Sequence, residues 1–132
     1  MSVAEKGLRI KLIPQTNQEA FDLAVRHLAT MKRRCAVGGA CRYRRHATSE
    51  KCVVGAMIRD DDYHPSLEGL GVRERVGDGD IVSVGVSVDL LSDLQRAHDL
   101  QLNWSYEGFD GWPSIHAIAQ AYGLTIPDLS QM

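Results

Sequence analysis

The chain has 132 residues, of which 44% are hydrophobic and 24% are charged, and its formal net charge is −2. This length is close to the commonest domain size, so we expect a single domain, residues 1–132, with an ordinary hydrophobic core. No apolar run is long enough to cross a membrane, and the first residues lack the apolar stretch of a secretion signal, so the sequence predicts a cytoplasmic protein without a membrane partner.

Charge is distributed unevenly along the chain. Residues 1–58 hold eleven Lys/Arg and four Asp/Glu, a net charge of +7, whereas residues 59–132 hold four and thirteen, a net charge of −9. Such an asymmetry can mark a surface that binds an oppositely charged partner. We favour the alternative that the two halves pack together in the fold and that their charges largely compensate.

The first predicted elements are a strand and a long helix. Apolar residues alternate with charged ones over residues 8–12, which predicts a strand that ends before Pro14. Thr16 and Glu19 form a capping box at the start of an amphipathic helix predicted over residues 17–34. The apolar stripe of this helix consists of Phe21, Ala24, Val25, Leu28 and Met31.

The middle of the chain carries weaker signals. Gly38-Gly39 interrupts it, and residues 35–51 are expected to form an irregular basic loop or a short hairpin. The apolar run 52–58 is too short for periodicity to decide, and we favour a short buried helix capped by Ser49. Residues 63–79 contain four glycines and a proline, so we expect a loop with at most one helical turn.

The last third of the chain predicts one strand and two helices. Valine alternates with serine and glycine in the strand expected over residues 81–87, which would pair with residues 8–12 because a lone strand leaves backbone groups unpaired. Helices are predicted over residues 89–99 and 113–122, and Gly123 ends the second. The sequence therefore predicts an α+β fold: a single small domain in which three main helices accompany a small two- or three-stranded antiparallel sheet.

Three cysteines and a histidine lie close together in the sequence. Cys35, Cys41, His46 and Cys52 could complete a tetrahedral zinc site, but their spacing lacks the tight Cys-x2-Cys pairs of established zinc knuckles. We therefore assign no metal and no other cofactor. The odd cysteine count argues against a disulfide framework, and we favour a reduced Cys41–Cys52 contact across a hairpin.

A cluster of basic residues with an interleaved tyrosine is the main candidate binding site. Arginine and aromatic side chains together can bind phosphates and stack on bases. We favour the alternative of a solvated face, or of arginines paired with the acidic residues 60–80, because the chain as a whole is not basic. The candidate binding residues are Lys32, Arg33, Arg34, Arg42, Tyr43, Arg44, Arg45 and Lys51, with His46 beside them.

Catalytic signals are sparse. His98-Asp99 and the acidic residues 60–68 are compatible with a small metal-dependent hydrolase or nuclease, but their spacing supports no specific one. The sequence has no Gly-x-Ser-x-Gly elbow, phosphate loop or His-Glu-x-x-His motif. We therefore predict no catalytic residue, which favours a protein that is not an enzyme.

Half of the eight aromatic residues fall within nine positions near the C-terminus. Such a cluster can anchor a protein interface. We favour the alternative of a small satellite core beneath a loop. The cluster consists of Trp104, Tyr106, Phe109 and Trp112.

The spacing of residues in the middle of the chain is distinctive. It reads Cys41-x-Tyr43-Arg44, then Lys51-Cys52-x-x-Gly55-x-x-Ile58-x-Asp60-x-x-Tyr63-x-Pro65-x-x-Glu68-Gly69, and later Leu94-Gln95-x-x-His98-Asp99. Over roughly residues 17–123 the chain resembles a group of small, uncharacterised proteins of tailed bacteriophages and prophages.

The resemblance implies an accessory protein in the cytoplasm of a bacterial host, and it identifies no catalytic residue. Our leading hypothesis is that the protein binds a host or phage protein complex, for example to inhibit a host defence or nucleic-acid-processing complex. The alternatives are a nucleic-acid-binding protein that uses residues 32–51 and a small metal-dependent hydrolase or nuclease. The sequence leaves the oligomeric state open.

We expect Tyr63, Pro65, Glu68 and Gly69 to be structural. Pro65 holds His64 extended, and the Tyr63 ring would pack beside the 53–58 run with its hydroxyl on a polar partner. Glu68 could cap a helix or pair with Arg44, and Gly69 allows a positive φ.

Overall fold

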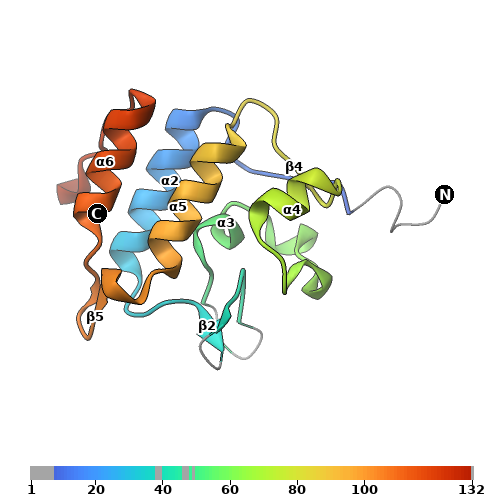
Figure 1. The fold of residues 1–132 in the computed structure, drawn as a ribbon, viewed down its shortest axis with the longest axis horizontal. Coiled ribbons are helices and arrows are strands. Elements are labelled where there is room, and N and C mark those ends of the chain that lie inside the picture. Colours follow the sequence, from blue (N-terminus) through green and yellow to red (C-terminus); the bar gives the residue numbers. More distant parts are fainter. Residues whose placement is uncertain (1–7, 38–39, 46–47, 49, 132) are drawn as a thin grey trace.

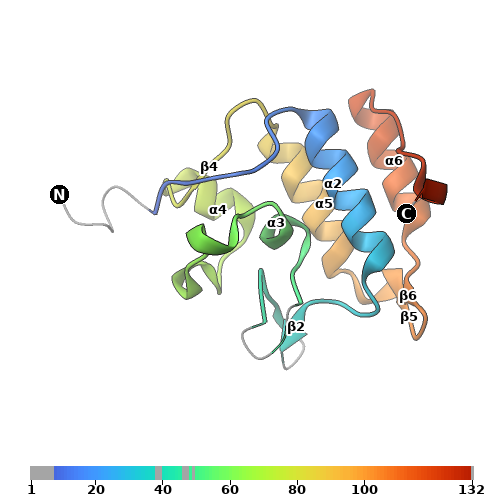
Figure 2. The same ribbon diagram turned by 180° about the vertical axis from the view of Figure 1, so that it is seen from behind.

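The computed structural model describes residues 8–37, 40–45, 48 and 50–131. Three long helices lie side by side (Figures 1 and 2). They are α2 (Asn17–Thr30), α5 (Val88–Asp99) and α6 (Trp112–Tyr122), and α5 contacts both of the others. Two short helices, α3 (Val53–Ala56) and α4 (Val72–Gly77), pack against α5, and α3 also packs against α2. The α+β class and the three main helices are confirmed.

The strands form three short pairs. They are β1 (Ile10–Lys11) with β4 (Ile81–Val82), β2 (Ala36–Val37) with β3 (Ala40–Cys41), and β5 (Trp104–Ser105) with β6 (Gly108–Phe109). The pairing of β1 with β4 agrees with the sequence analysis, but these two strands run parallel, whereas the other two pairs are antiparallel. A parallel pair requires a long crossover connection, and the chain between β1 and β4 supplies one that includes three helices.

Short 3₁₀ turns connect several of these elements. They are η1 (Asp60–Asp62), η2 (Pro65–Leu67), η3 (Gln101–Asn103) and η4 (Leu129–Gln131). The single helical turn expected between residues 63 and 79 corresponds to η2. Helix α4 lies in the same stretch and was not expected, because its glycine-rich sequence predicts a loop.

The boundaries of the long helices follow local signals. Thr16 accepts a hydrogen bond from the Glu19 amide at 3.1 Å, and the Glu19 carboxylate accepts one from the Gln15 amide at 3.0 Å. In α5, Ser87 accepts a hydrogen bond from the Leu90 amide. Helix α6 ends at Gly123, whose φ of 66° is the left-handed conformation that glycine favours.

Two elements are shorter than the sequence predicts. Helix α2 ends at Thr30 instead of residue 34, because Met31 is extended and the following basic residues leave the helix. Strand β4 ends at Val82, because the Ser83 hydroxyl donates to the Val86 carbonyl across a turn that contains Gly85, with a φ of 82°.

The buried run after residue 51 forms α3, as expected. Its cap is the Cys52 sulfur, which accepts from the Gly55 amide at 3.2 Å. Ser49, which the sequence analysis chose as the cap, lies outside the described residues.

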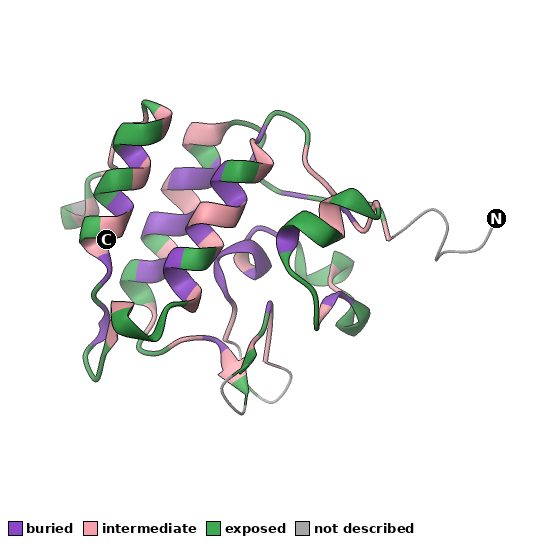
Figure 3. Cartoon of the chain, in the orientation of Figure 1, coloured by how far each residue is buried: buried purple, intermediate pink, exposed green. Residues whose placement is uncertain are grey.

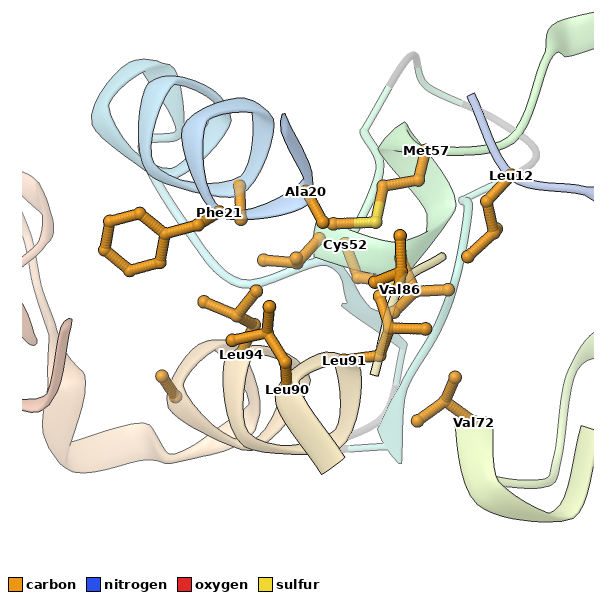
Figure 4. Packing of buried hydrophobic residues seen from close by; sticks show 14 of the residues in the cluster. Leu12, Ala20, Phe21, Cys52, Met57, Val72, Val86, Leu90, Leu91 and Leu94 are labelled. Carbon is orange, nitrogen blue, oxygen red and sulfur yellow. The ribbon is translucent and has the colours of Figure 1, made fainter. Parts of the chain in front are cut away.

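The core lies between α2, α5 and α3 (Figure 3). Buried side chains of α2 and α5 face one another, and α3 contributes a second layer beside them (Figure 4). The largest fully buried side chains from these segments are Phe21, Leu28, Met57, Leu90, Leu91 and Leu94. Within the described part of the chain, no helix has both the length and the apolar character of a membrane-spanning segment.

Gly55 lies so close to the Tyr43 carbonyl that an added methyl group would overlap this backbone atom. The obstacle cannot rotate away, because the same carbonyl accepts a hydrogen bond from the Cys52 amide at 2.9 Å. We expect Gly55→Ala to lower the free energy of unfolding by about 1–3 kcal/mol, as other overpacking substitutions do. Urea denaturation measures this change.

Gly77→Ala is the matched control, since an added Cβ there meets no atom within 4 Å. Alanine is the better helix former, so this variant should be as stable as the parent or gain up to about 1 kcal/mol. Equal losses of unfolding free energy in Gly55→Ala and Gly77→Ala would contradict the inference that overlap with the Tyr43 carbonyl destabilises the first variant.

Candidate functional site

Several of the residues quoted for the resemblance lie in one partly buried network of hydrogen bonds, and Glu68 occupies one end of it. Its Oε1 accepts a hydrogen bond from the Tyr43 amide at 2.9 Å. Its Oε2 accepts from the Arg44 amide at 3.1 Å and from the Tyr63 hydroxyl at 2.6 Å. Burial and the Glu68 carboxylate raise the pKa of Tyr63. Gly69 follows with a φ of 97°, as expected.

Arg44 extends the network to the end of α3. Its guanidinium donates to the carbonyls of Gly55 and Ile58, forms an ion pair with Asp60 at 2.8 Å, and lies 5.0 Å from the centre of the Tyr63 ring. The Arg44 side chain is only 12% exposed. Arg44 therefore stabilises the fold at this point, and it is turned away from any external ligand.

The second half of the network lies on α5. Gln95 accepts a hydrogen bond from the Val54 amide at 3.1 Å and donates one to the Asp99 carboxylate at 2.8 Å. His98 is fully buried, and its Nε2 accepts from the Cys35 amide at 3.1 Å. Burial alone would raise the pKa of Asp99, but the hydrogen bonds from His98 and Gln95 outweigh it, so this pKa is lowered.

The hydrogen bonds of His98 fix its tautomer. A backbone amide can only donate, so Nε2 must present its lone pair to Cys35, and the neutral ring carries its proton on Nδ1. Nδ1 then donates to Asp99 Oδ1 at 2.8 Å. In this state neither ring nitrogen has a free lone pair for a metal ion or for a proton from a substrate.

Within the described residues, one group of three potential metal ligands lies together: Cys41, His98 and Asp99, with ligand atoms within 4.8 Å of one another. His98 is not available for the reason just given. Burial and the nearby Asp99 raise the pKa of the Cys41 thiol to about 11, and the Arg34 guanidinium lies 3.4 Å from its sulfur. These residues do not fit a metal ion in this arrangement, and no acid of residues 60–68 joins them.

The three cysteines that were weighed as zinc ligands, of which Cys41 and Cys52 were expected to contact one another, lie in three different segments of the fold. Cys35 and Cys52 are fully buried, Cys52 caps α3, and Cys41 lies opposite Ala36 in the β2–β3 hairpin. All three thiols are free. Burial raises the pKa of Cys35 to about 12 and also raises that of Cys52. His46, the fourth candidate zinc ligand, lies outside the described residues.

Four of the candidate binding residues have side chains that are at least partly buried and bind partners within the protein. Besides Arg44, Tyr43 is only 5% exposed and its hydroxyl donates to the Leu70 carbonyl. Lys51 pairs with Asp60 at 3.1 Å, as the alternative of pairing with residues 60–80 predicts. Arg45 pairs with Glu50 at 3.0 Å.

The remaining basic side chains lie on the surface where α2 ends. Arg33 is 68% exposed and pairs with Glu50 at 2.8 Å. Arg34 donates to the Asp99 carbonyl at 2.7 Å and to the Gln101 side chain. Lys32 and Arg42 are exposed, and neither forms an ion pair with an acid among the described residues.

The structure divides the aromatic cluster. Trp104, Phe109 and Trp112 pack edge to face in series, with ring centres 5.2 Å and 4.9 Å apart, so these three form the expected satellite core. Tyr106 lies in the turn between β5 and β6 and is 94% exposed. Three rings of the cluster are therefore packed together, and the ring of Tyr106 is exposed to solvent.

Two surface recesses border these residues. The first has a volume of about 460 Å³ and lies beside the network, where Arg34, Cys41, Glu68, Gln95 and Asp99 form part of its wall. The second, which we name the arginine–aromatic recess, has a volume of about 430 Å³. It is lined by Arg33, Arg34, Ala36, Gln101, Trp104, Ser105 and Tyr106.

No protein-family model matches the chain, and neither the curated proteins nor the solved structures include a match. The sequence analysis did not anticipate the arginine–aromatic recess, because its arginines and its aromatic residues come from opposite ends of the chain. It also did not anticipate that Gln95 binds the first turn of α3.

Glu68 uses both carboxylate oxygens as acceptors, so Glu68→Gln places an NH2 group, which can only donate, against at least one of these donors. We expect this variant to lower the free energy of unfolding by about 1–3 kcal/mol. Tyr63→Phe removes a single hydrogen bond and should lower it by about 0.5–1.5 kcal/mol. Glu107→Gln, at an exposed site, is the control and should stay within about 0.5 kcal/mol of the parent. A Glu68→Gln protein as stable as this control would refute the stabilising role that we assign to the Glu68 carboxylate.

Burial lowers the pKa of His27 below its ordinary value of 6.5, although a hydrogen bond to the Lys51 carbonyl opposes this effect. The unfolded chain therefore takes up a proton at His27 at a higher pH than the folded chain does. We expect the stability from neutral His27 to be complete above pH 6.5, to fall as the pH drops towards the folded-state pKa, and to level off below it. Urea denaturation between about pH 7.5 and pH 5 measures this slope. His27→Gln should show a smaller fall, and an equal fall in both proteins would exclude His27 as its source.

Proposed function

We propose that this protein is a phage or prophage accessory protein that acts by binding a host or phage protein complex and does not catalyse a reaction. The groups most capable of chemistry support this proposal, because they are already engaged. Both His98 nitrogens and both Glu68 oxygens have partners, and the cysteine thiols stay protonated at neutral pH. Because these groups already bind partners within the protein or stay protonated, we propose a function in binding instead of catalysis.

The observation that carries the proposal is the set of cations in the segments that follow α2 and β3. Lys32 and Arg42 are exposed without an acidic partner among the described residues, and the hydrogen-bond partners of Arg34 are neutral groups. An acidic surface on the partner would complement these charges and speed its association. Binding of this kind is sensitive to salt, because exposed charges are screened.

A second candidate function is nucleic-acid binding. Tyr43 and Arg44 contribute little to it, because both side chains face inward. The arginine–aromatic recess favours it instead, since it combines guanidinium groups with an exposed ring.

Affinity capture from a bacterial host lysate, followed by mass spectrometry, tests the leading proposal. We expect the parent to retain a defined partner, and the double variant Lys32→Glu, Arg42→Glu to retain at least several-fold less of it, with a slower association rate. Arg59→Glu is the matched control: Arg59 is exposed, lines a different recess, and should leave capture unchanged. Repeated failure to recover any partner, or equal capture by both variants, would count against the proposal.

A further inference from the structure

The arginine–aromatic recess has a chemical character of its own. Two guanidinium groups, two aromatic rings, an amide and a hydroxyl line it, and none of its described lining residues is acidic. Its residues come from the stretch between α2 and β2 and from the stretch that runs from η3 through β5 into the β5–β6 turn (Figure 1). The charges at this site therefore favour an anionic ligand.

The positive charge of Arg34 is held in place without being neutralised by a hydrogen-bonded carboxylate. Its three hydrogen-bond acceptors are the Asp99 carbonyl, the Gln101 side-chain oxygen and the Cys41 sulfur, all of which are uncharged. Arg33 donates to Glu50 through Nε and Nη2, so its Nη1 stays available for a second partner. Arginine binds phosphate with paired, directional hydrogen bonds, which suits this arrangement.

On the aromatic side of the recess, Trp104 is held in place by its contacts, whereas Tyr106 is exposed. The Trp104 indole donates to the His98 carbonyl and packs edge to face against both His98 and Phe109. Tyr106, two residues further on, is 94% exposed. A ring in this position can stack on a base at little cost in ordering, because the β5–β6 pair fixes its backbone.

We propose that the arginine–aromatic recess binds one nucleotide of a single-stranded nucleic acid, with the phosphate at Arg33 and Arg34 and the base against Tyr106. Cationic side chains and an exposed aromatic ring are the combination by which proteins bind single strands without strong sequence preference. A duplex hides its base faces from such a ring. This inference does not depend on the proposed protein partner, and purified protein is sufficient to test it.

The test measures fluorescence anisotropy of fluorescein-labelled oligothymidylate and oligouridylate of about 15 nucleotides. One neutralised phosphate predicts that the logarithm of affinity falls with the logarithm of salt concentration with a slope of about −0.7. Tyr106→Ala should weaken binding about tenfold or more, whereas Tyr106→Phe keeps the stacking face and should bind like the parent. Arg33→Gln should weaken binding several-fold and make the salt slope shallower, because only Arg34 then remains at the phosphate.

Arg59→Gln is the control for loss of one positive charge at a different recess and should leave affinity unchanged. Melting temperatures verify that each variant is folded. Failure of both oligonucleotides to bind at low salt would overturn the proposal, as would equal loss of affinity in Arg59→Gln and Tyr106→Ala. Thymidine monophosphate that binds as tightly as the oligonucleotide would assign the recess to free nucleotides and overturn the single-strand assignment. A captured protein that is lost with Tyr106→Ala, without oligonucleotide binding, would overturn it in favour of a protein interface.

Discussion

The chain between α2 and α5 has little regular secondary structure, and its course depends on the carboxylate of Glu68. A buried carboxylate is unfavourable unless its oxygens accept hydrogen bonds. Glu68 has three such donors, and they come from Tyr43, Arg44 and Tyr63, so one side chain fixes the segment after β3 against the segment after η1. Arg44 is thereby positioned to donate to the carbonyls of Gly55, in α3, and of Ile58, just beyond it, and so to hold the end of this four-residue helix.

The residues of the phage resemblance are best understood as the parts of this internal network. Gly55 permits close approach of the Tyr43 carbonyl, Asp60 pairs with Arg44 and Lys51, and Gln95 binds an amide of α3. Each has a structural role that few other residue types could fill. The binding that we propose would therefore use side chains outside the network, such as the exposed cations and Tyr106.

Local signals in the sequence were sufficient where structure is decided within a few residues. Thr16 and Gly123 each marked a real helix boundary, because capping involves atoms at most four residues apart. The parallel orientation of β1 and β4, and the existence of α4, depend on contacts across the chain that no local pattern encodes. The same holds for the candidate site. Arg42 and Arg44 are two residues apart in one basic run, yet one is exposed and the other is held inside by partners far along the sequence.

One arginine from the basic half of the sequence, Arg34, lies at the C-terminal end of α5. Helices α2 and α5 run in the same direction, and their C-terminal ends meet near β2 and β5 (Figure 1). The C-terminal end of a helix carries partial negative charge and free carbonyls, which stabilise nearby cations. Arg34 makes this contact directly, through the Asp99 carbonyl at the last residue of α5. Because the helix end satisfies the arginine without a hydrogen-bonded carboxylate, Arg34 is held in place in the free protein and keeps a net positive charge that suits the anionic ligand we propose for the arginine–aromatic recess.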